Sequence, residues 1–195
     1  MNFYKIGQFL CRVFFRTAFR VKVEGEENIP ATGPVLVCSN HISNMDPPAV
    51  GAFIQRELRF MAKEELFRFK PLGVILKSVG AFSIKRGGGD RQALKDGIKM
   101  LKEEQALMIF PEGTRSKTGE LGKGMAGAGF FALRSHAVVV PCYVHGPYRL
   151  FRTVRVEFGP PIPENELYGE KLSSQELTDI IMKHIAMLKE NKTQV

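Results

Sequence analysis

The sequence has no tryptophan, only three cysteines and no long uninterrupted run of apolar residues. Cys11, Cys38 and Cys142 are widely spaced, and none belongs to a CxxC pair. This argues against a disulfide framework or a zinc site and fits a reducing cytosol. No apolar run approaches the roughly 20 residues that a membrane-spanning helix needs. Because arginines recur through the first segment, a secretory signal peptide is not predicted either.

Acidic residues are missing from the first 22 positions, where basic and aromatic side chains recur with helical periodicity. The basic residues that fall on one narrow stripe are Lys5, Arg12, Arg16 and Arg20. The apolar residues that cover much of the remaining surface are Phe3, Ile6, Leu10, Cys11, Phe14, Phe15 and Ala18. We predict that residues 1–20 form an amphipathic helix lying on an anionic membrane. The alternative is that its phenylalanines pack against the body of the protein.

The chain of 195 residues suits one domain, which we place at residues 21–195. Its hydrophobic content of 44% and charged content of 25% are typical of a folded globular protein, so extensive disorder is not expected. The net charge of +8 favours anionic partners. Charge alone does not distinguish nucleic acid, anionic lipid and phosphorylated substrates.

Short apolar segments alternate with segments of helical periodicity. Predicted strands include 33–40, 80–86, 106–113, 137–146 and 153–162. Predicted helices include 47–58, 89–105, 122–136 and 173–191. This alternation predicts an α/β domain with a largely parallel or mixed sheet flanked by helices.

A histidine and an aspartate follow the predicted strand 33–40. In such sheets ligands gather at the carboxyl ends of strands, where His41 stands. Asp46 precedes Pro47 and is expected to be a helix N-cap. The loop, supported by Ser43, can fold back so that the carboxylate contacts one imidazole nitrogen and leaves the other free as a base. The alternative is a loop histidine beside a helix cap, since this spacing also arises by chance.

No serine lies in a GxSxG elbow, and no cysteine has a second base beside it. A base at His41 would therefore activate a hydroxyl of the substrate rather than one of the protein.

A second cluster of candidate ligand-binding residues lies at the carboxyl end of the predicted strand that begins at residue 106. Its tight turn consists of Glu112, Gly113, Thr114 and Arg115. Glycine allows close approach of the backbone to a ligand, and arginine suits bidentate binding of phosphate. Further basic groups expected at strand ends or at the start of the next helix are Lys85, Arg86 and Lys123. Each alone could be an ordinary surface cation.

The segments NHISNMD, GAFSIKR, FPEGTRS and VVVPCYV stand in the order and spacing of the glycerolipid acyltransferase family. Over about residues 20–160 the chain resembles the 1-acyl-sn-glycerol-3-phosphate acyltransferases. The resemblance implies transfer of a fatty acyl group from an acyl thioester to the free sn-2 hydroxyl of 1-acyl-sn-glycerol 3-phosphate. The product would be phosphatidic acid, a precursor in phospholipid biosynthesis.

The resemblance also implies roles for individual residues. His41 would be the general base and Asp46 would orient it. The residues that would bind the acceptor phosphate are Arg86, Glu112, Gly113, Thr114, Arg115 and Lys123. The residues that would support the site are Asn40, Ser43, Lys85 and Pro141.

The implied partners are a membrane lipid, an anionic membrane surface, and acyl-CoA or acyl-carrier protein as co-substrate. No metal, no cofactor and no nucleic acid are implied. The expected location is peripheral, on the cytoplasmic face of the cell membrane.

Alternative functions stay open from the residues alone. The acceptor could be another lysophospholipid or glycerol 3-phosphate. A thioesterase or lipase would use the same pair on water but would leave the basic cluster unexplained. A non-catalytic module that binds anionic lipid would explain the charge but would leave His41 and Asp46 without a role.

Overall fold

The computed structural model describes residues 3–85, 90–169 and 171–190. The strands are β1 (Arg20–Glu24), β2 (Val35–Ser39), β3 (Leu58–Lys63), β4 (Ala81–Ile84), β5 (Ala106–Ile109), β6 (Val138–His145) and β7 (Thr153–Phe158). The helices are α1 (Phe3–Ala18), η1 (a 3-10 turn, Glu26–Asn28), α2 (Asp46–Phe53), α3 (Glu64–Arg68), α4 (Lys70–Ser78), α5 (Arg91–Lys102), α6 (Gly127–Ser135), α7 (Glu164–Tyr168) and α8 (Ser174–Glu190).

The strands form one sheet in the order β1-β7-β6-β2-β5-β3-β4. Pairing is parallel throughout except between β6 and β7, which run antiparallel. The predicted α/β fold with a largely parallel sheet is confirmed. Because β2, β3, β4, β5 and β6 point the same way, the loops after them meet at one edge of the sheet.

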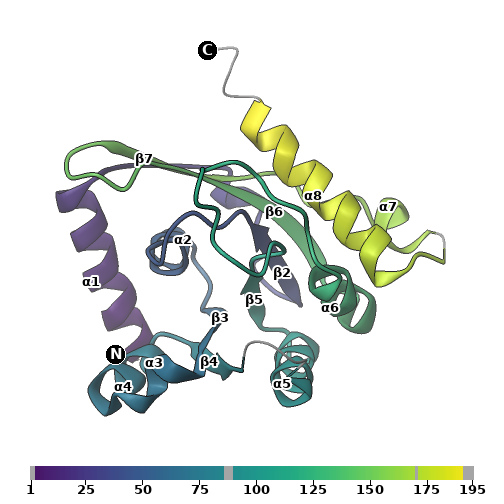
Figure 1. Ribbon diagram of the computed structural model, residues 1–195, viewed down its shortest axis with the longest axis horizontal. Coiled ribbons are helices and arrows are strands. Elements are labelled where there is room, and N and C mark those ends of the chain that lie inside the picture. Colours follow the sequence, from purple (N-terminus) through teal and green to yellow (C-terminus); the bar gives the residue numbers. More distant parts are fainter. Residues whose placement is uncertain (1–2, 86–89, 170, 191–195) are drawn as a thin grey trace.

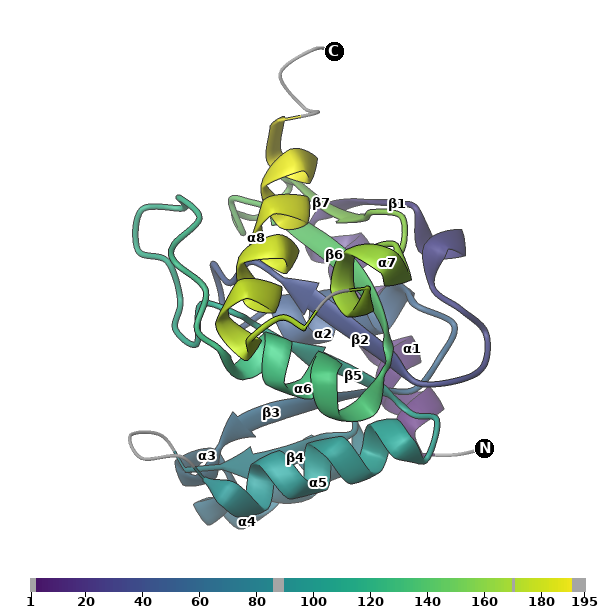
Figure 2. The same cartoon turned by 90° about the vertical axis from the view of Figure 1, so that its right-hand side faces the viewer.

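Helices cover both faces of the sheet, which explains why its central strands are apolar on both sides. Val35 and Val37 of β2 belong to a core cluster with residues of α1 and α2, whereas Leu36 and Cys38 belong to a cluster with residues of α6 and α8. Figures 1 and 2 show α1 and α2 on one side of the sheet and α5, α6 and α8 on the other.

Several predicted boundaries were wrong. The helix predicted over 47–58 ends at Phe53, and Leu58 already opens β3. The helix predicted over 122–136 begins at Gly127. The apolar pattern of the first continues past Phe53, whereas the second is preceded by the glycine-containing segment 122–126, and periodicity alone does not show where the chain changes direction.

The small residues of α6 allow it to pack closely on α8. A Cβ at Gly129 would lie 2.0 Å from the backbone oxygen of Ser174 and 2.8 Å from Cβ of Leu177. The Gly129 N–H donates to Oγ1 of Thr178 at 2.9 Å, so the two helices are also joined by a hydrogen bond.

Gly129→Ala is expected to lower the free energy of unfolding by about 1–3 kcal/mol through overpacking. Urea denaturation measures this, and an unchanged midpoint would contradict the packing.

The N-terminal helix packs against the body of the protein, as the second predicted alternative has it, and its contact with a membrane stays a prediction. Tyr4 and Phe15 are buried against the body, and the Leu58 N–H donates to the Tyr4 hydroxyl at 2.8 Å. Arg12 donates to the Ala52 carbonyl at 2.9 Å, and the Arg12 and Arg16 guanidiniums lie about 6.0 Å and 5.8 Å from the ring centre of Phe53.

These arginines therefore face α2, whose last carbonyls lack partners within their own helix. Arg20 lies in β1, so the prediction that it continues the helical stripe is wrong. The large apolar side chains that α1 exposes are Phe3, Phe9, Leu10, Val13 and Phe14. No helix in the described ranges combines the length and the apolar character needed to cross a bilayer.

Candidate active site

The loops at the carboxyl edge of the sheet surround a cavity of about 320 Å³. His41 follows β2, Lys63 ends β3, Lys85 follows β4 and Phe110 follows β5, and all four residues line the cavity. The apolar part of the wall includes Met61, Ile84, Leu94, Met108, Ile109 and Phe131. The cavity thus offers an imidazole and two lysines beside an apolar space.

His41 and Asp46 are in direct contact. Nδ1 of His41 lies 2.8 Å from Oδ2 of Asp46, and both residues are buried. The same oxygen accepts the backbone N–H groups of Ile42 at 2.7 Å and Ser43 at 2.8 Å. Because Oδ2 acts as an acceptor toward all three groups, Nδ1 carries the hydrogen and Nε2 carries the free lone pair.

Asp46 is not the N-cap that the sequence predicts. It is the first residue of α2, Met45 holds the cap position, and no side chain caps the helix. Prolines occupy the first helical turn and have no N–H, so few donors are available there to a capping carboxylate. The Asp46 side chain turns back toward the His41 loop instead.

The imidazole is held on its other sides as well. The Phe110 ring stacks on it with ring centres 3.9 Å apart and planes 15° apart. The Ser116 N–H donates to the His41 carbonyl at 2.7 Å. Asn40 joins β2 to β6, because its amide donates to the Val144 carbonyl at 3.0 Å and its oxygen accepts the Val144 N–H at 2.7 Å. The orientation of His41 is thereby fixed by the backbone around it.

Glu112 links two loops. Its Oε1 accepts the His41 N–H at 3.1 Å, and its Oε2 accepts the Gly122 N–H at 2.8 Å. The side chain is buried, with both oxygens occupied by the chain itself. This geometry supports a structural role for Glu112, and direct contact with the acceptor stays a prediction.

Gly113 requires the absence of a side chain. Its φ is 65°, and an added Cβ would lie 1.8 Å from Cε of Met125. Thr114 and Arg115 follow on the exposed side of the turn, outside the wall of the cavity. Arg115 forms no ion pair with any residue in the described part of the chain, so its guanidinium is available to an anion.

The other predicted residues are placed as follows. The Lys85 N–H donates to Oδ2 of Asp90 at 2.9 Å, and Lys85 is an exposed residue at the cavity wall. Lys123 is exposed and lies in the segment before α6, so its prediction at the start of a helix is wrong. Pro141 lies within β6, beside Cys38 of β2. Arg86 falls outside the described residues.

Sequence reasoning missed two groups at the cavity. Lys63 ends β3, and the rule that strand ends carry ligands would have found it. Asp90 caps α5 by accepting the N–H groups of Gln92 and Ala93. These bonds and the one from the Lys85 N–H lower the pKa of Asp90.

The described cavity wall contains no serine, threonine or cysteine. Cys38 and Cys142 are buried nearby, and burial raises the pKa of both, that of Cys142 to about 12. A neutral buried thiol is a poor nucleophile. The fold and the site therefore define an α/β protein with a buried histidine–aspartate pair at the strand ends and, among the described residues, no serine, threonine or cysteine in the cavity wall.

Residues 20–145 match the Acyltransferase family, and the chain belongs to this family. It is 35% identical over 128 residues to the 1-acyl-sn-glycerol-3-phosphate acyltransferase of Bacillus subtilis, covering 65% of this chain and 63% of that protein. It is 30% identical over 138 residues to the chloroplastic 1-acyl-sn-glycerol-3-phosphate acyltransferase LPAT1 of Arabidopsis thaliana, covering 69% of this chain and 38% of that protein. These matches confirm the family resemblance of the motifs.

The fold is also that of a known crystal structure. The acyltransferase PlsC from Thermotoga maritima superposes with a TM-score of 0.77 and 23% identity, over 99% of this chain and 81% of that one. The chain spans between 38% and 63% of the length of the Arabidopsis and Bacillus relatives.

Proposed function

We propose that the protein transfers a fatty acyl group from an acyl thioester to the free sn-2 hydroxyl of 1-acyl-sn-glycerol 3-phosphate. The observation that carries this proposal is the fixed His41–Asp46 pair beside an apolar cavity with lysines in its wall. The two relatives described above are both named 1-acyl-sn-glycerol-3-phosphate acyltransferases, which supports this acceptor. The lysines and Arg115 supply charge for the acceptor phosphate, and the apolar wall suits an acyl chain.

The mechanism follows from the free Nε2 of His41. This atom removes the proton from the acceptor hydroxyl as its oxygen attacks the thioester carbonyl carbon. The carbon–sulfur bond then breaks, and the leaving thiolate takes the proton from the imidazolium. Asp46 stabilises the imidazolium and holds its orientation. A thioester is already activated, so a positioned base and oriented substrates can suffice without an acyl-enzyme intermediate.

The test is an assay of purified protein with labelled acyl-CoA or acyl-carrier protein and a panel of lysolipids. The panel should include glycerol 3-phosphate and lysophosphatidylcholine. Phosphatidic acid formed from lysophosphatidic acid is the expected product. Release of free fatty acid at the same rate without any acceptor would instead identify a hydrolase.

We propose that Arg115 acts mainly on the acceptor. A charged contact to phosphate is worth about 1.5–3 kcal/mol, so Arg115→Ala is expected to raise the KM for lysophosphatidic acid more than about tenfold. The KM for the acyl donor should change little. Arg134→Ala is the matched control, because that guanidinium lies over the Phe130 ring on α6. An equal rise in both KM values would contradict the assignment, as would no rise at all. The same role is proposed for Arg86.

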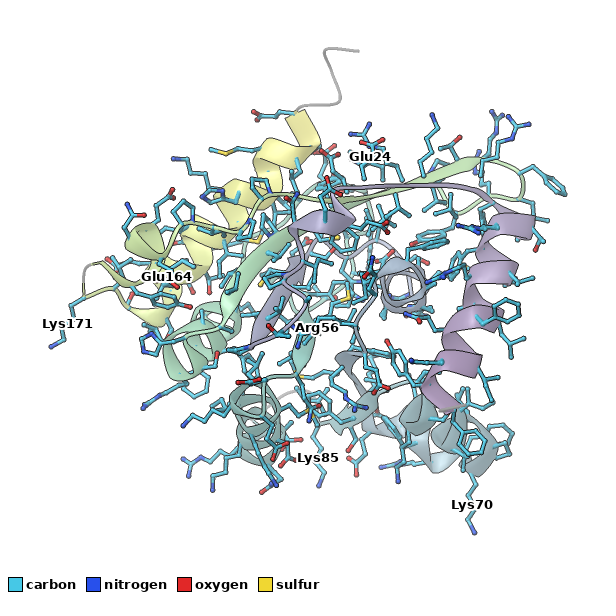
Figure 3. All side chains as sticks on the ribbon, turned by 180° about the vertical axis from the view of Figure 1, so that it is seen from behind. Glu24, Arg56, Lys70, Lys85, Glu164 and Lys171 are labelled. Carbon is cyan, nitrogen blue, oxygen red and sulfur yellow. The ribbon has the colours of Figure 1, made fainter. Side chains whose placement is uncertain are left out.

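The protein is also proposed to bind the membrane through the exposed apolar residues of α1, α3, α4 and the β6–β7 connection, called here the docking face. Its exposed residues are Phe3, Phe9, Leu10, Val13, Phe14, Leu66, Phe69, Val74, Ile75, Leu150 and Phe151. Figure 1 shows that α1 runs along one side of the domain, with α3 and α4 at one end and the β6–β7 turn at the other. In Figure 3, Lys70 at the start of α4 points away from the body, as expected of a cation that reaches lipid headgroups.

Attachment would be peripheral and on the cytoplasmic face. The three free cysteines support a reducing compartment. The lysophospholipid acceptor has its tail in the bilayer, so a docked helix would bring the cavity to its substrate.

A further inference from the structure

The two oxygens of the Asp46 carboxylate have different surroundings. Oδ2 accepts hydrogen bonds from His41, Ile42 and Ser43. Oδ1 is buried, and no hydrogen-bond partner for it exists in the described ranges. A buried carboxylate oxygen without a donor is unfavourable, so a neighbouring donor that could satisfy it would be stabilising.

Tyr148, in the connection between β6 and β7, offers that donor. Its hydroxyl is also buried and also has no hydrogen-bond partner among the residues described. Burial raises the pKa of Tyr148, and so do the charge and the hydrogen-bonding proximity of the Asp46 carboxylate. The phenol therefore keeps its proton and lies within electrostatic reach of Asp46.

The ring of Tyr148 is fixed from the side of α1. It meets the Phe19 ring edge-on with centres 5.8 Å apart, and the centre of the Phe15 ring lies 6.5 Å away. Both phenylalanines are buried. The connection that carries Tyr148 is tied to the end of α1, because the Phe151 N–H donates to the Ala18 carbonyl at 2.8 Å. The Tyr148 hydroxyl is thus held in place by packing, and the Asp46 side chain carries the buried oxygen that lacks a donor.

We propose that Tyr148 is a positioning residue that donates its hydroxyl to Oδ1 of Asp46 and so holds the carboxylate against His41 during acyl transfer. The inference rests on the proposed function. When His41 takes the proton from the acceptor, an imidazolium forms beside the carboxylate. A donor on Oδ1 prevents the carboxylate from rotating away from Nδ1 at that moment.

The test compares Tyr148→Phe with Tyr168→Phe. The first variant keeps the ring packed on Phe15 and Phe19 and removes only the hydroxyl. Because one net hydrogen bond is at stake, kcat is expected to fall about five- to tenfold with both KM values and the melting temperature unchanged. Tyr168 donates to the carbonyls of Ala132 at 3.3 Å and Ala137 at 3.0 Å, away from the site. Its variant should lower the melting temperature and leave kcat unchanged.

A double-mutant cycle separates positioning from general packing. In an Asp46→Asn background, Tyr148→Phe should cause no further loss of kcat, because the carboxylate it positions is gone. Full additivity would overturn the proposal, and so would an unchanged kcat in the single variant of an active enzyme.

An independent readout does not need turnover. In the NMR spectrum of protein labelled with 13Cζ-tyrosine, the resonance that disappears in Tyr148→Phe is that of Tyr148. We expect this resonance to shift in Asp46→Asn. An unchanged chemical shift would overturn the contact. Absence of acyl transfer by the wild-type protein would instead refute the proposed function, and the resonance would still report on the contact.

Discussion

Replacement of His41 by alanine is expected to reduce kcat by about 10²–10⁴-fold, the contribution typical of a positioned general base. The reason is geometric, because Nε2 of His41 is the free basic nitrogen of the pair at the cavity. The measurement is steady-state transfer to lysophosphatidic acid, with circular dichroism to show that the fold is kept. His184→Ala is the matched control, since that imidazole lies on α8 and pairs with Glu166 at 3.0 Å.

Asp46→Ala should behave differently. The imidazole remains and can still adopt the productive tautomer part of the time, so measurable turnover should persist. The variant should also unfold at a lower temperature, because Ile42 and Ser43 lose the acceptor for their N–H groups. Near-normal kcat in a folded His41→Ala protein would refute the mechanism.

Polar substitution of the docking face should release the protein from vesicles. Phe3, Phe9, Leu10 and Val13 are exposed on α1, and their conversion together to glutamine removes exposed apolar area. If each contributes about 1 kcal/mol on partial insertion, the four contribute roughly 4 kcal/mol, or about a thousandfold in partitioning. Vesicle co-sedimentation measures the loss, and an unchanged melting temperature shows that the fold is intact.

Controls for this experiment come from the same chain. Met187→Gln, on the opposite side of the sheet and 43% exposed, should leave binding unchanged, in contrast to Phe9→Gln. Added salt should weaken binding only modestly, because the predicted basic stripe is not intact: Arg12 is hydrogen-bonded to α2 and Arg20 belongs to β1. Full binding by the quadruple variant would exclude α1 as an anchor.

Deletion of residues 1–20 would not by itself test membrane binding. Tyr4, Phe15 and Phe19 are buried, so their removal exposes core and is expected to unfold the domain. The helical period reveals two faces, but it does not show which of them meets the protein. Here the carbonyls at the end of α2 attract the arginines, and an apolar stripe is left outside.

The candidate site could be located in the sequence from the rule that ligands gather at the carboxyl ends of parallel strands. This rule needs only the order of strands and helices, which the alternation of apolar and helical segments reveals. His41 and Lys85 were placed in this way, and both line the cavity. The N-cap prediction for Asp46 failed because Pro47 follows it and offers no N–H. No local sequence pattern around Tyr148 predicts a role in the site. Its position is set by the packing of the β6–β7 connection, which is distant in sequence, against the end of α1.

The pairing of β1 with β7 has a consequence for how the domain is made. Within the described ranges β1 pairs with β7 alone, and the five strands β2 to β6 separate the two in the sequence. During synthesis β1 therefore emerges before its partner, which is translated only after those five strands. We expect the aromatic face of α1 to meet the bilayer during this interval. The sheet would then close onto a helix that already rests on lipid, so that folding and membrane attachment become a single event.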